Sequence, residues 1–386
     1  MPTTPLKNTA YRLMLPFLAP GPEKHPAHTA QGHVIHHEKQ LLQLIRRHHV
    51  LGAALLLWNG QDMAEIYTDA ANPPHHADRR TYFRVASITK TATAAVMLRM
   101  MDAGLLHPDQ PCSSFFPGET FPAPFRSITL RHLLSHTSGL TDPPSLEKDL
   151  EEGVPLDAVL KQMPVREAPG AAFRYSNLGF GILGCIMEKV TGVPVDALFD
   201  EWLFRPLNMR ATLSGCRLNP SEIMPVTRVL PYHPGQDLIL TPLGKRPLNE
   251  ADPMRHYGHT AGSMYTDLPS LYRLFRELIL NEGKWWKPES LAEMRKEHAS
   301  YGRLSPTLSY GWGLLRIRDP EISGSLVLGH QGFAYGCADG AFWEEGSGRM
   351  MIFLNGGCSE ARRGRLGLAN RDLLRFAFRK ELPSWS

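Results

Sequence analysis

Residues 82–104 read YFRVASITKTATAAVMLRMMDAG, a short β-type run followed by a long run of alanine, methionine and leucine that ends at Gly104. The pattern predicts a strand at 82–85 and a helix at 87–103. The helix is apolar on nearly every side, which is typical of a helix buried in the core of a domain. The stretch therefore predicts that Ser87 stands where a strand gives way to a buried helix.

Ser87-Ile88-Thr89-Lys90 places a serine and a lysine one helical turn apart, so that both face the same side. A serine oxygen is a weak nucleophile until an adjacent base takes its proton. A lysine drawn into a buried turn loses hydration, and its pKa falls toward that of a proton acceptor. The beginning of the helix also offers N–H groups and a positive dipole to a developing oxyanion. A helix N-cap serine with a solvated lysine has the same pattern, so the tetrapeptide alone leaves both interpretations open.

Two further segments carry polar side chains beside apolar elements. Tyr175-Ser176-Asn177 lies in a predicted loop before an apolar helix at 178–190. A nearby lysine ammonium lowers the pKa of a tyrosine and lets it act as a base, while an asparagine orients partners as donor and acceptor. His330-Gln331-Gly332 follows a short predicted strand at 326–328. Gly332 lets a substrate approach the backbone, and the N–H of Phe333 is then a second oxyanion donor beside that of Ser87. Taken alone, a packed tyrosine and a core histidine explain these residues equally well.

The elements around these segments predict the fold class. A helix at 38–48 and a hairpin of strands at 50–58 and 61–68, joined at Asn59-Gly60, come first. Strands are also expected near the end of the chain, at 310–317, 326–328, 338–343 and 350–355, with a turn at 345–348. Between them lie helices near 130–135, 156–162, 178–190, 195–203, 267–281 and 288–297, and a proline-bearing loop region at 215–259 that shapes a cleft. One shared sheet is the simplest way to cover both sets of strands.

We therefore predict an α/β (α+β) fold, in which an antiparallel sheet formed from both chain ends is flanked by helices and interrupted by a helical subdomain. Residues 1–34, rich in Pro, His and Thr, are expected to form an extended or loosely packed N-terminal arm. The main domain covers 35–365, and a C-terminal helix within 366–386 packs on the sheet. The sheet takes in about 35–90 and about 300–386, and the helical insertion about 100–260.

Composition narrows the function classes. The net charge of +4 over 386 residues, with basic residues interspersed among acids, predicts no nucleic-acid partner. Five scattered cysteines without CxxC spacing favour free thiols in a reducing compartment. The apolar patch at 13–19 is too short for a good signal peptide, and no run approaches the roughly 20 apolar residues of a membrane-spanning helix. We expect a cytoplasmic protein with no membrane partner.

Cofactor and metal motifs are weighed and set aside. Several histidines lie near the N-terminus, but most fall in the predicted arm and no HExxH is present. No GxSxG elbow occurs, which argues against an α/β-hydrolase. No GxGxxG or Walker motif follows a strand. The sequence therefore predicts no metal and no cofactor.

Taken together and in this order, the three polar segments resemble those of the serine β-lactamase and penicillin-binding-protein superfamily. The closest match is its class C-like branch, which also holds D-aminopeptidases, DD-peptidases and esterases. Residues 130–140, LRHLLSHTSGL, are very similar to the LRHLLxHTSGL signature of this branch. Residues 261–268, AGSMYTDL, resemble its AGGLxST…DL block, with Ser263 where glycine is more frequent. Residues 310–314, YGWGL, resemble its YGxGW strand with the order shifted. The resemblance spans roughly residues 38–360.

The resemblance implies a covalent acyl-enzyme on Ser87, with Lys90 as its activating partner. Tyr175 is then the general base that passes the proton to the leaving group, and Asn177 hydrogen-bonds the substrate and Lys90. His330-Gln331-Gly332 occupies the place of the KTG triad. A histidine, mostly neutral at pH 7, replaces the lysine that helps recognise the carboxylate of a β-lactam. This replacement weakens the case for antibiotic hydrolysis, whereas many peptidase and esterase relatives carry HxG.

Three hypotheses follow. The first is a serine hydrolase that turns over a small ester, amide or short peptide. The second is a β-lactamase, which rapid hydrolysis of a chromogenic cephalosporin would reveal. The third is a penicillin-binding module that acylates without turnover, which a long-lived adduct would reveal. The natural substrate depends on loops such as 215–259, and neither it nor the oligomeric state follows from the sequence.

Overall fold

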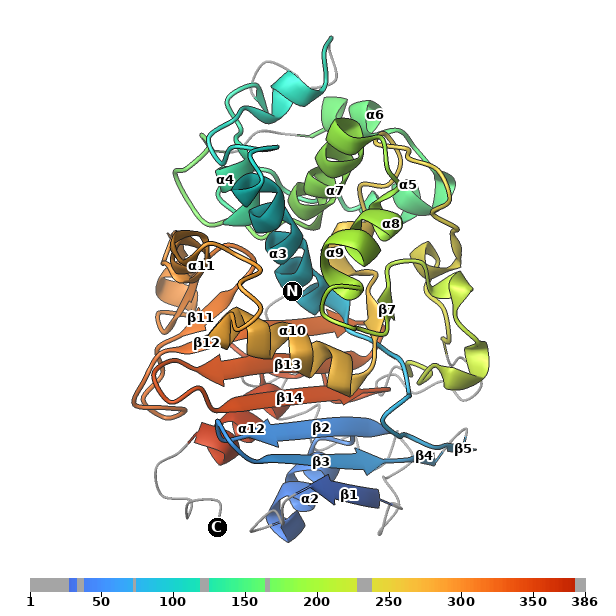
Figure 1. Cartoon of the computed structure of the whole chain (residues 1–386), viewed down its shortest axis with the longest axis vertical. Coiled ribbons are helices and arrows are strands. Elements are labelled where there is room, and N and C mark those ends of the chain that lie inside the picture. Colours follow the sequence, from blue (N-terminus) through green and yellow to red (C-terminus); the bar gives the residue numbers. More distant parts are fainter. Residues whose placement is uncertain are drawn as a thin grey trace.

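A large antiparallel sheet forms one half of the molecule (Figure 1). The computed structural model describes residues 28–32, 38–71, 74–118, 125–163, 167–227 and 238–378, and within these the sheet has nine strands in the order β1-β3-β2-β14-β13-β12-β11-β10-β9. The strands are β1 His28–Gly32, β2 Ala53–Trp58, β3 Met63–Thr68, β9 Ala299–Ser300, β10 Leu308–Tyr310, β11 Leu315–Ile317, β12 Val327–Ala334, β13 Cys337–Glu344 and β14 Met350–Asn355. β2 pairs with β14 along its whole length, so the two ends of the chain share one sheet, as predicted.

Both faces of the sheet are covered, because its central strands are apolar on both sides. Leu55 and Leu57 of β2 face a cluster formed with α2 (Glu38–Arg47) and α12 (Leu368–Phe378). Leu56 and Trp58 face the opposite cluster, and the ring of Trp58 contacts Tyr272 of α10 (Leu268–Leu280) edge-on. Figure 1 shows α10 across one face of the sheet and α2 with α12 on the other. The predicted hairpin is present, since Asn59 Oδ1 accepts the N–H of Asp62 across the turn at 2.7 Å.

The helical half of the molecule is built around α3 (Thr89–Asp102). Nearly every side chain of α3 is buried, as its uniformly apolar sequence predicts. α7 (Asn177–Thr191) packs beside it and presents Gly181 to the chain at Tyr257, where a Cβ would come within 1.4 Å of the carbonyl oxygen. The other helices in the part described are α4 Leu130–Leu134, α5 Leu146–Glu152, α6 Leu156–Lys161, α8 Val195–Phe199, α9 His259–Gly262 and α11 Pro288–Arg295.

A small three-stranded sheet joins the two halves. Its order is β6-β8-β7, with β6 Phe83–Arg84, β7 Ala211–Thr212 and β8 Tyr265–Thr266. β6 leads directly into the turn that carries Ser87, so this sheet fixes where the first chemical segment enters the helical half. Two-stranded ribbons, β4 (Ala70–Ala71) with β5 (Pro74–His75) and β15 (Arg362–Arg363) with β16 (Leu366–Gly367), complete the described strands.

Three predicted elements differ from the structure. The predicted arm at 1–34 contains β1, which pairs with β3 through backbone hydrogen bonds alone and so needs no apolar pattern; the rest of the arm lies outside the described residues. The predicted strand at 310–317 is two antiparallel strands, because Gly313 at φ 65° turns the chain between β10 and β11. The strand predicted at 326–328 continues to Ala334, so His330 and Phe333 lie within β12 rather than after it.

No single described helix has the length and apolar composition to span a membrane; only the pair Asn177–Thr191 and Val195–Phe204, bent by 87°, meets the two criteria together.

Candidate active site

Ser87 lies in a single 3₁₀ turn, Ala86–Ile88, that runs directly into α3. Ala86 has φ 44°, a strained conformation for a residue with a side chain. Two hydrogen bonds from Thr89 and Val85 hold it there: Thr89 Oγ1 donates to the Ala86 carbonyl at 2.6 Å, and the Val85 N–H donates to the Met264 carbonyl at 3.0 Å. The block at 261–266 thus supports the backbone that presents Ser87, which sequence reasoning could not see.

Lys90 is fully buried one turn after Ser87. Its Nζ lies 3.1 Å from Ser87 Oγ, and it donates to Asn177 Oδ1 at 2.8 Å and to the Ala261 carbonyl at 2.6 Å. Burial lowers the pKa of Lys90 to about 7; the carboxylate of Asp142 opposes this shift and Arg84 adds to it. The predicted fall in pKa is therefore present, and a large fraction of the Lys90 amines is neutral near pH 7.

Tyr175 approaches Ser87 from the other side. Its hydroxyl donates to Ser87 Oγ at 2.8 Å, while its ring lies 4.9 Å from Lys90 Nζ. Burial of the phenol raises the pKa of Tyr175, against a smaller opposite effect of the Ser87 hydrogen bond. The predicted lowering of this pKa was therefore wrong, because a lysine that is itself half neutral offers too little charge to outweigh desolvation. Tyr175 is a protonated donor in this site.

Asp142, which sequence reasoning missed, holds Tyr175-Ser176-Asn177 in place. Its carboxylate accepts four hydrogen bonds, from Ser176 Oγ at 2.7 Å, the Asn177 N–H at 2.8 Å, Asn177 Nδ2 at 2.9 Å and the Leu178 N–H at 3.0 Å. It therefore caps the N-terminus of α7 and turns Asn177 Oδ1 toward Lys90. The available signal was its position, two residues after the LRHLLSHTSGL segment.

His136, from that same segment, packs beneath the tyrosine. Its Nδ1 accepts the N–H of Ser176 at 3.2 Å, and its ring centroid lies 4.3 Å from that of Tyr175 and 4.8 Å from that of Tyr310. Burial lowers the pKa of His136 well below its ordinary value, so the ring is neutral. His136 is thus a packing and positioning residue between two tyrosines.

His330 is also buried and neutral. Burial, assisted by the charge of Lys90, lowers the pKa of His330 to about 3. Nδ1 donates to the Gln331 carbonyl at 2.7 Å, which leaves Nε2 to accept the Tyr310 hydroxyl at 2.9 Å. Both ring nitrogens have protein partners, so the carboxylate contact made by the lysine in β-lactamases has no counterpart in this ring.

The N–H of Phe333 points out of the sheet toward the site. Tyr335 and Gly336, with φ 56° and 112°, form a two-residue turn, which makes Ala334 and Cys337 a hydrogen-bonded pair. Alternation then directs the N–H of Phe333 away from β13. On that side β11 ends its pairing at Gly329, so the edge beyond it is open.

Gly332 next to it has a different role from the one predicted. The prediction was that its missing side chain lets a substrate approach the strand. The structure shows that the Ser87 segment itself comes close, since a Cβ on Gly332 would lie 2.4 Å from the Val85 carbonyl oxygen. Glycine at this position therefore lets β12 pack against the turn that carries Ser87.

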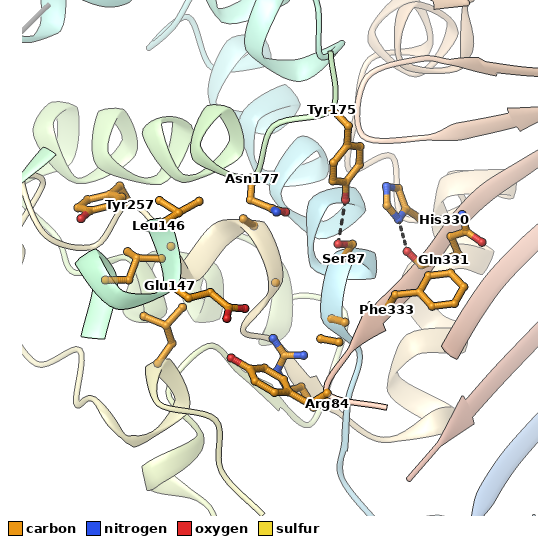
Figure 2. Close-up of a pocket in the computed structure, with 18 of the residues that line it drawn as sticks. Arg84, Ser87, Leu146, Glu147, Tyr175, Asn177, Tyr257, His330, Gln331 and Phe333 are labelled. Atoms are coloured by element: carbon orange, nitrogen blue, oxygen red, sulfur yellow. Dashed lines mark hydrogen bonds between the residues drawn. The ribbon is translucent and has the colours of Figure 1, made fainter. Parts of the chain in front are cut away.

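The predicted residues meet in one cavity of about 640 Å³ between the two halves of the molecule. Figure 2 shows Tyr175 and Asn177 converging on Ser87 from the helical side, with His330, Gln331 and Phe333 on the strand side. Arg84 and Glu147 also line the cavity, and sequence reasoning had singled out neither. Ser263 is buried behind the site, and its Oγ has no hydrogen-bond partner in the part of the chain described. Among the described residues, no group of three or more His, Cys, Asp or Glu side chains forms a metal-binding cluster.

Comparison with known proteins places this geometry in a family. The Beta-lactamase family model matches residues 34–357. Esterase EstB of Burkholderia gladioli is 29% identical over 340 residues, covering 76% of this chain and 81% of the esterase. The crystal structure of a D-stereospecific amidohydrolase from Streptomyces sp. has a TM-score of 0.65 at 24% identity, covering 83% of this chain and 94% of that one. EstCE1, a hydrolase with promiscuous acyltransferase activity, has a TM-score of 0.67 at 20% identity, covering 96% and 100%. The two structures share the fold, and the family match extends over most of the sequence. The chain belongs to the β-lactamase family and is a serine hydrolase of the esterase, amidase or peptidase type.

Proposed function

We propose that the protein hydrolyses a small ester or amide through a covalent acyl-enzyme on Ser87. The observation that carries the proposal is the pair of contacts on Ser87 Oγ, with Lys90 Nζ at 3.1 Å and the Tyr175 hydroxyl at 2.8 Å. A nucleophile flanked by a half-neutral amine and a protonated phenol has both a proton acceptor and a proton donor within reach.

The reaction begins with attack of Ser87 Oγ on the substrate carbonyl carbon while its proton moves to the neutral amine of Lys90. The N–H groups of Ser87 and Phe333 stabilise the oxyanion. Tyr175 donates its proton to the departing oxygen or nitrogen, and the Lys90 ammonium returns the serine proton to the phenolate. Water then attacks the acyl-enzyme, releases the acid and restores Ser87. Asn177 keeps Lys90 in place and offers its amide to the substrate.

The two alternatives predict different fates for the adduct. A β-lactamase would hydrolyse a chromogenic cephalosporin rapidly, and a penicillin-binding module would keep the acyl group. Neither ring nitrogen of His330 is free to bind a β-lactam carboxylate, which favours ester or amide turnover over both.

Intact-protein mass after treatment with a fluorophosphonate tests the proposal. We expect one adduct on the native chain, located on Ser87 by peptide mapping, and none on the Ser87→Ala variant. An adduct that persists in the variant would place the nucleophile elsewhere. No adduct on a folded native chain would contradict the hydrolase mechanism and leave a binding role.

The pH dependence of kcat/KM should follow the titration of Lys90. Below its pKa of about 7 the amine is protonated and cannot accept the serine proton, so kcat/KM for a neutral ester should fall with falling pH and level off above this value. His330, with a pKa of about 3, adds no titration in this range. Initial rates between pH 5 and 9 at constant ionic strength measure the limb; a profile without a titration near 7 would contradict the assignment of Lys90 as the base.

A further inference from the structure

Arg84 is a buried cation without a matching anion beside the nucleophile. Its side chain is only 8% exposed, yet it lines the same cavity as Ser87. Nε and Nη1 have no hydrogen-bond partner among the described residues. Leaving buried donors of a charged group unpaired is costly, so such a group is normally paired or satisfied.

The surroundings hold the guanidinium in place but do not neutralise it. Its central carbon lies 5.2 Å from the centre of the Tyr335 ring, and Nη2 lies close to Gly262, whose missing side chain leaves room there. Asp339 is the buried carboxyl group on this side, and burial raises its pKa well above the ordinary value, so it is protonated. Glu147 and Glu151 line the cavity from α5, but neither comes within ion-pair distance of Arg84 in the described structure.

The position of Arg84 relative to the reacting groups assigns it to one side of the substrate. Figure 2 shows Arg84 and Tyr175 on opposite sides of Ser87, with the guanidinium directed into the cavity. Tyr175 serves the leaving group in the proposed reaction. The portion of the substrate that faces Arg84 is therefore the acyl portion, which stays on Ser87.

We propose that Arg84 is an anion subsite for the acyl chain, so that the preferred substrates are esters or amides whose acyl group carries a carboxylate. This proposal rests on the acyl-enzyme mechanism above. A carboxylate entering the cavity supplies the acceptors that the guanidinium lacks, and a planar fork of donors suits a carboxylate better than a point charge does. The cavity of about 640 Å³ has room for such a chain.

Two matched esters test the subsite: mono-p-nitrophenyl adipate and the p-nitrophenyl ester of adipamic acid, in which an uncharged amide replaces the carboxylate. We expect the native enzyme to prefer the adipate ester in kcat/KM, and Arg84→Gln to reduce that preference by about 10- to 100-fold, the range of a charge-assisted contact. The ratio of the two esters cancels the separate effect of Arg84 on the pKa of Lys90, which both share. Arg84→Lys should retain part of the preference.

Arg365 provides the matched control, since it is an exposed arginine on the same cavity. Arg365→Gln removes an equal charge from the mouth and should change the ratio by less than about twofold, because exposed charges are screened. An unchanged ratio in a folded Arg84→Gln variant, or an equal effect of Arg365→Gln, would overturn the proposal.

A binding measurement separates failure of the subsite from failure of the mechanism. In the Ser87→Ala variant, adipate should raise the thermal midpoint and adipamide should not, and Ser87→Ala combined with Arg84→Gln should lose the response. If native enzyme turns over neither ester while adipate still stabilises the single variant through Arg84, the subsite stands and the acyl-enzyme proposal fails. If both esters are turned over equally and adipate gives no stabilisation, the subsite fails alone.

Discussion

Replacing Lys90 by methionine is expected to lower kcat/KM for a neutral ester by roughly 10³- to 10⁴-fold, the range lost when a general base that works with its nucleophile is removed. Methionine nearly fills the space of the lysine side chain but cannot take the proton of Ser87, whose Oγ lies 3.1 Å from Nζ. The rate of fluorophosphonate labelling should fall in parallel, because the defect lies in the activation of Ser87.

The variant must be shown to fold, and the titration of Lys90 offers a direct check. Because its pKa in the folded protein is about 7 rather than the ordinary 10.5, the unfolded chain binds more protons between these values. The free energy of unfolding of the native protein should therefore rise with pH across this window, and Lys90→Met should lack that increment. Lys161→Met, which removes an exposed lysine paired with Asp157, serves as the control. A folded Lys90→Met enzyme with more than a tenth of native activity would assign the base to another group.

The chemistry of Ser87 and Lys90 could be anticipated from the sequence because it is local. A strand followed by an apolar helix places both residues within one turn, and burial of that helix depresses the pKa of the lysine whatever surrounds it. The pairing of the two chain ends in one sheet was similarly accessible, since two sets of apolar strands need a common cover.

The features that sequence reasoning missed depend on contacts between distant segments. Asp142 acts 35 residues away on Asn177, and nothing local distinguishes it from a loop aspartate. The carbonyl of Ala261 that binds Lys90 is a backbone group, which no side-chain pattern reveals. The direction of the Phe333 N–H follows from strand register, and the sign of the Tyr175 pKa shift depends on how far the phenol is buried. The unpaired guanidinium of Arg84 is visible only once its neighbours are placed.

Replacing Tyr175 by phenylalanine is expected to slow the reaction by an amount that depends on the leaving group. The ring would keep its contact with His136, while the hydroxyl that donates to Ser87 Oγ at 2.8 Å would be lost. An alkyl alkoxide is too basic to leave without a proton, so kcat/KM for an ethyl ester should fall by roughly 10²- to 10³-fold. A p-nitrophenolate leaves readily as an anion, so the p-nitrophenyl ester of the same acid should lose less than about tenfold.

The ratio of the two losses identifies the step at which Tyr175 acts. Tyr301→Phe removes another phenol from the wall of the same cavity and should affect both esters by less than about threefold, because it has no place in the proton path. Since Lys90 remains in the Tyr175→Phe variant, its fluorophosphonate labelling, which expels fluoride, should be largely kept. An equal loss for the ethyl and nitrophenyl esters, together with slow labelling, would mean that Tyr175 activates Ser87. In that case the raised pKa of the phenol, which makes it a proton donor at rest, could not describe the working state of the site.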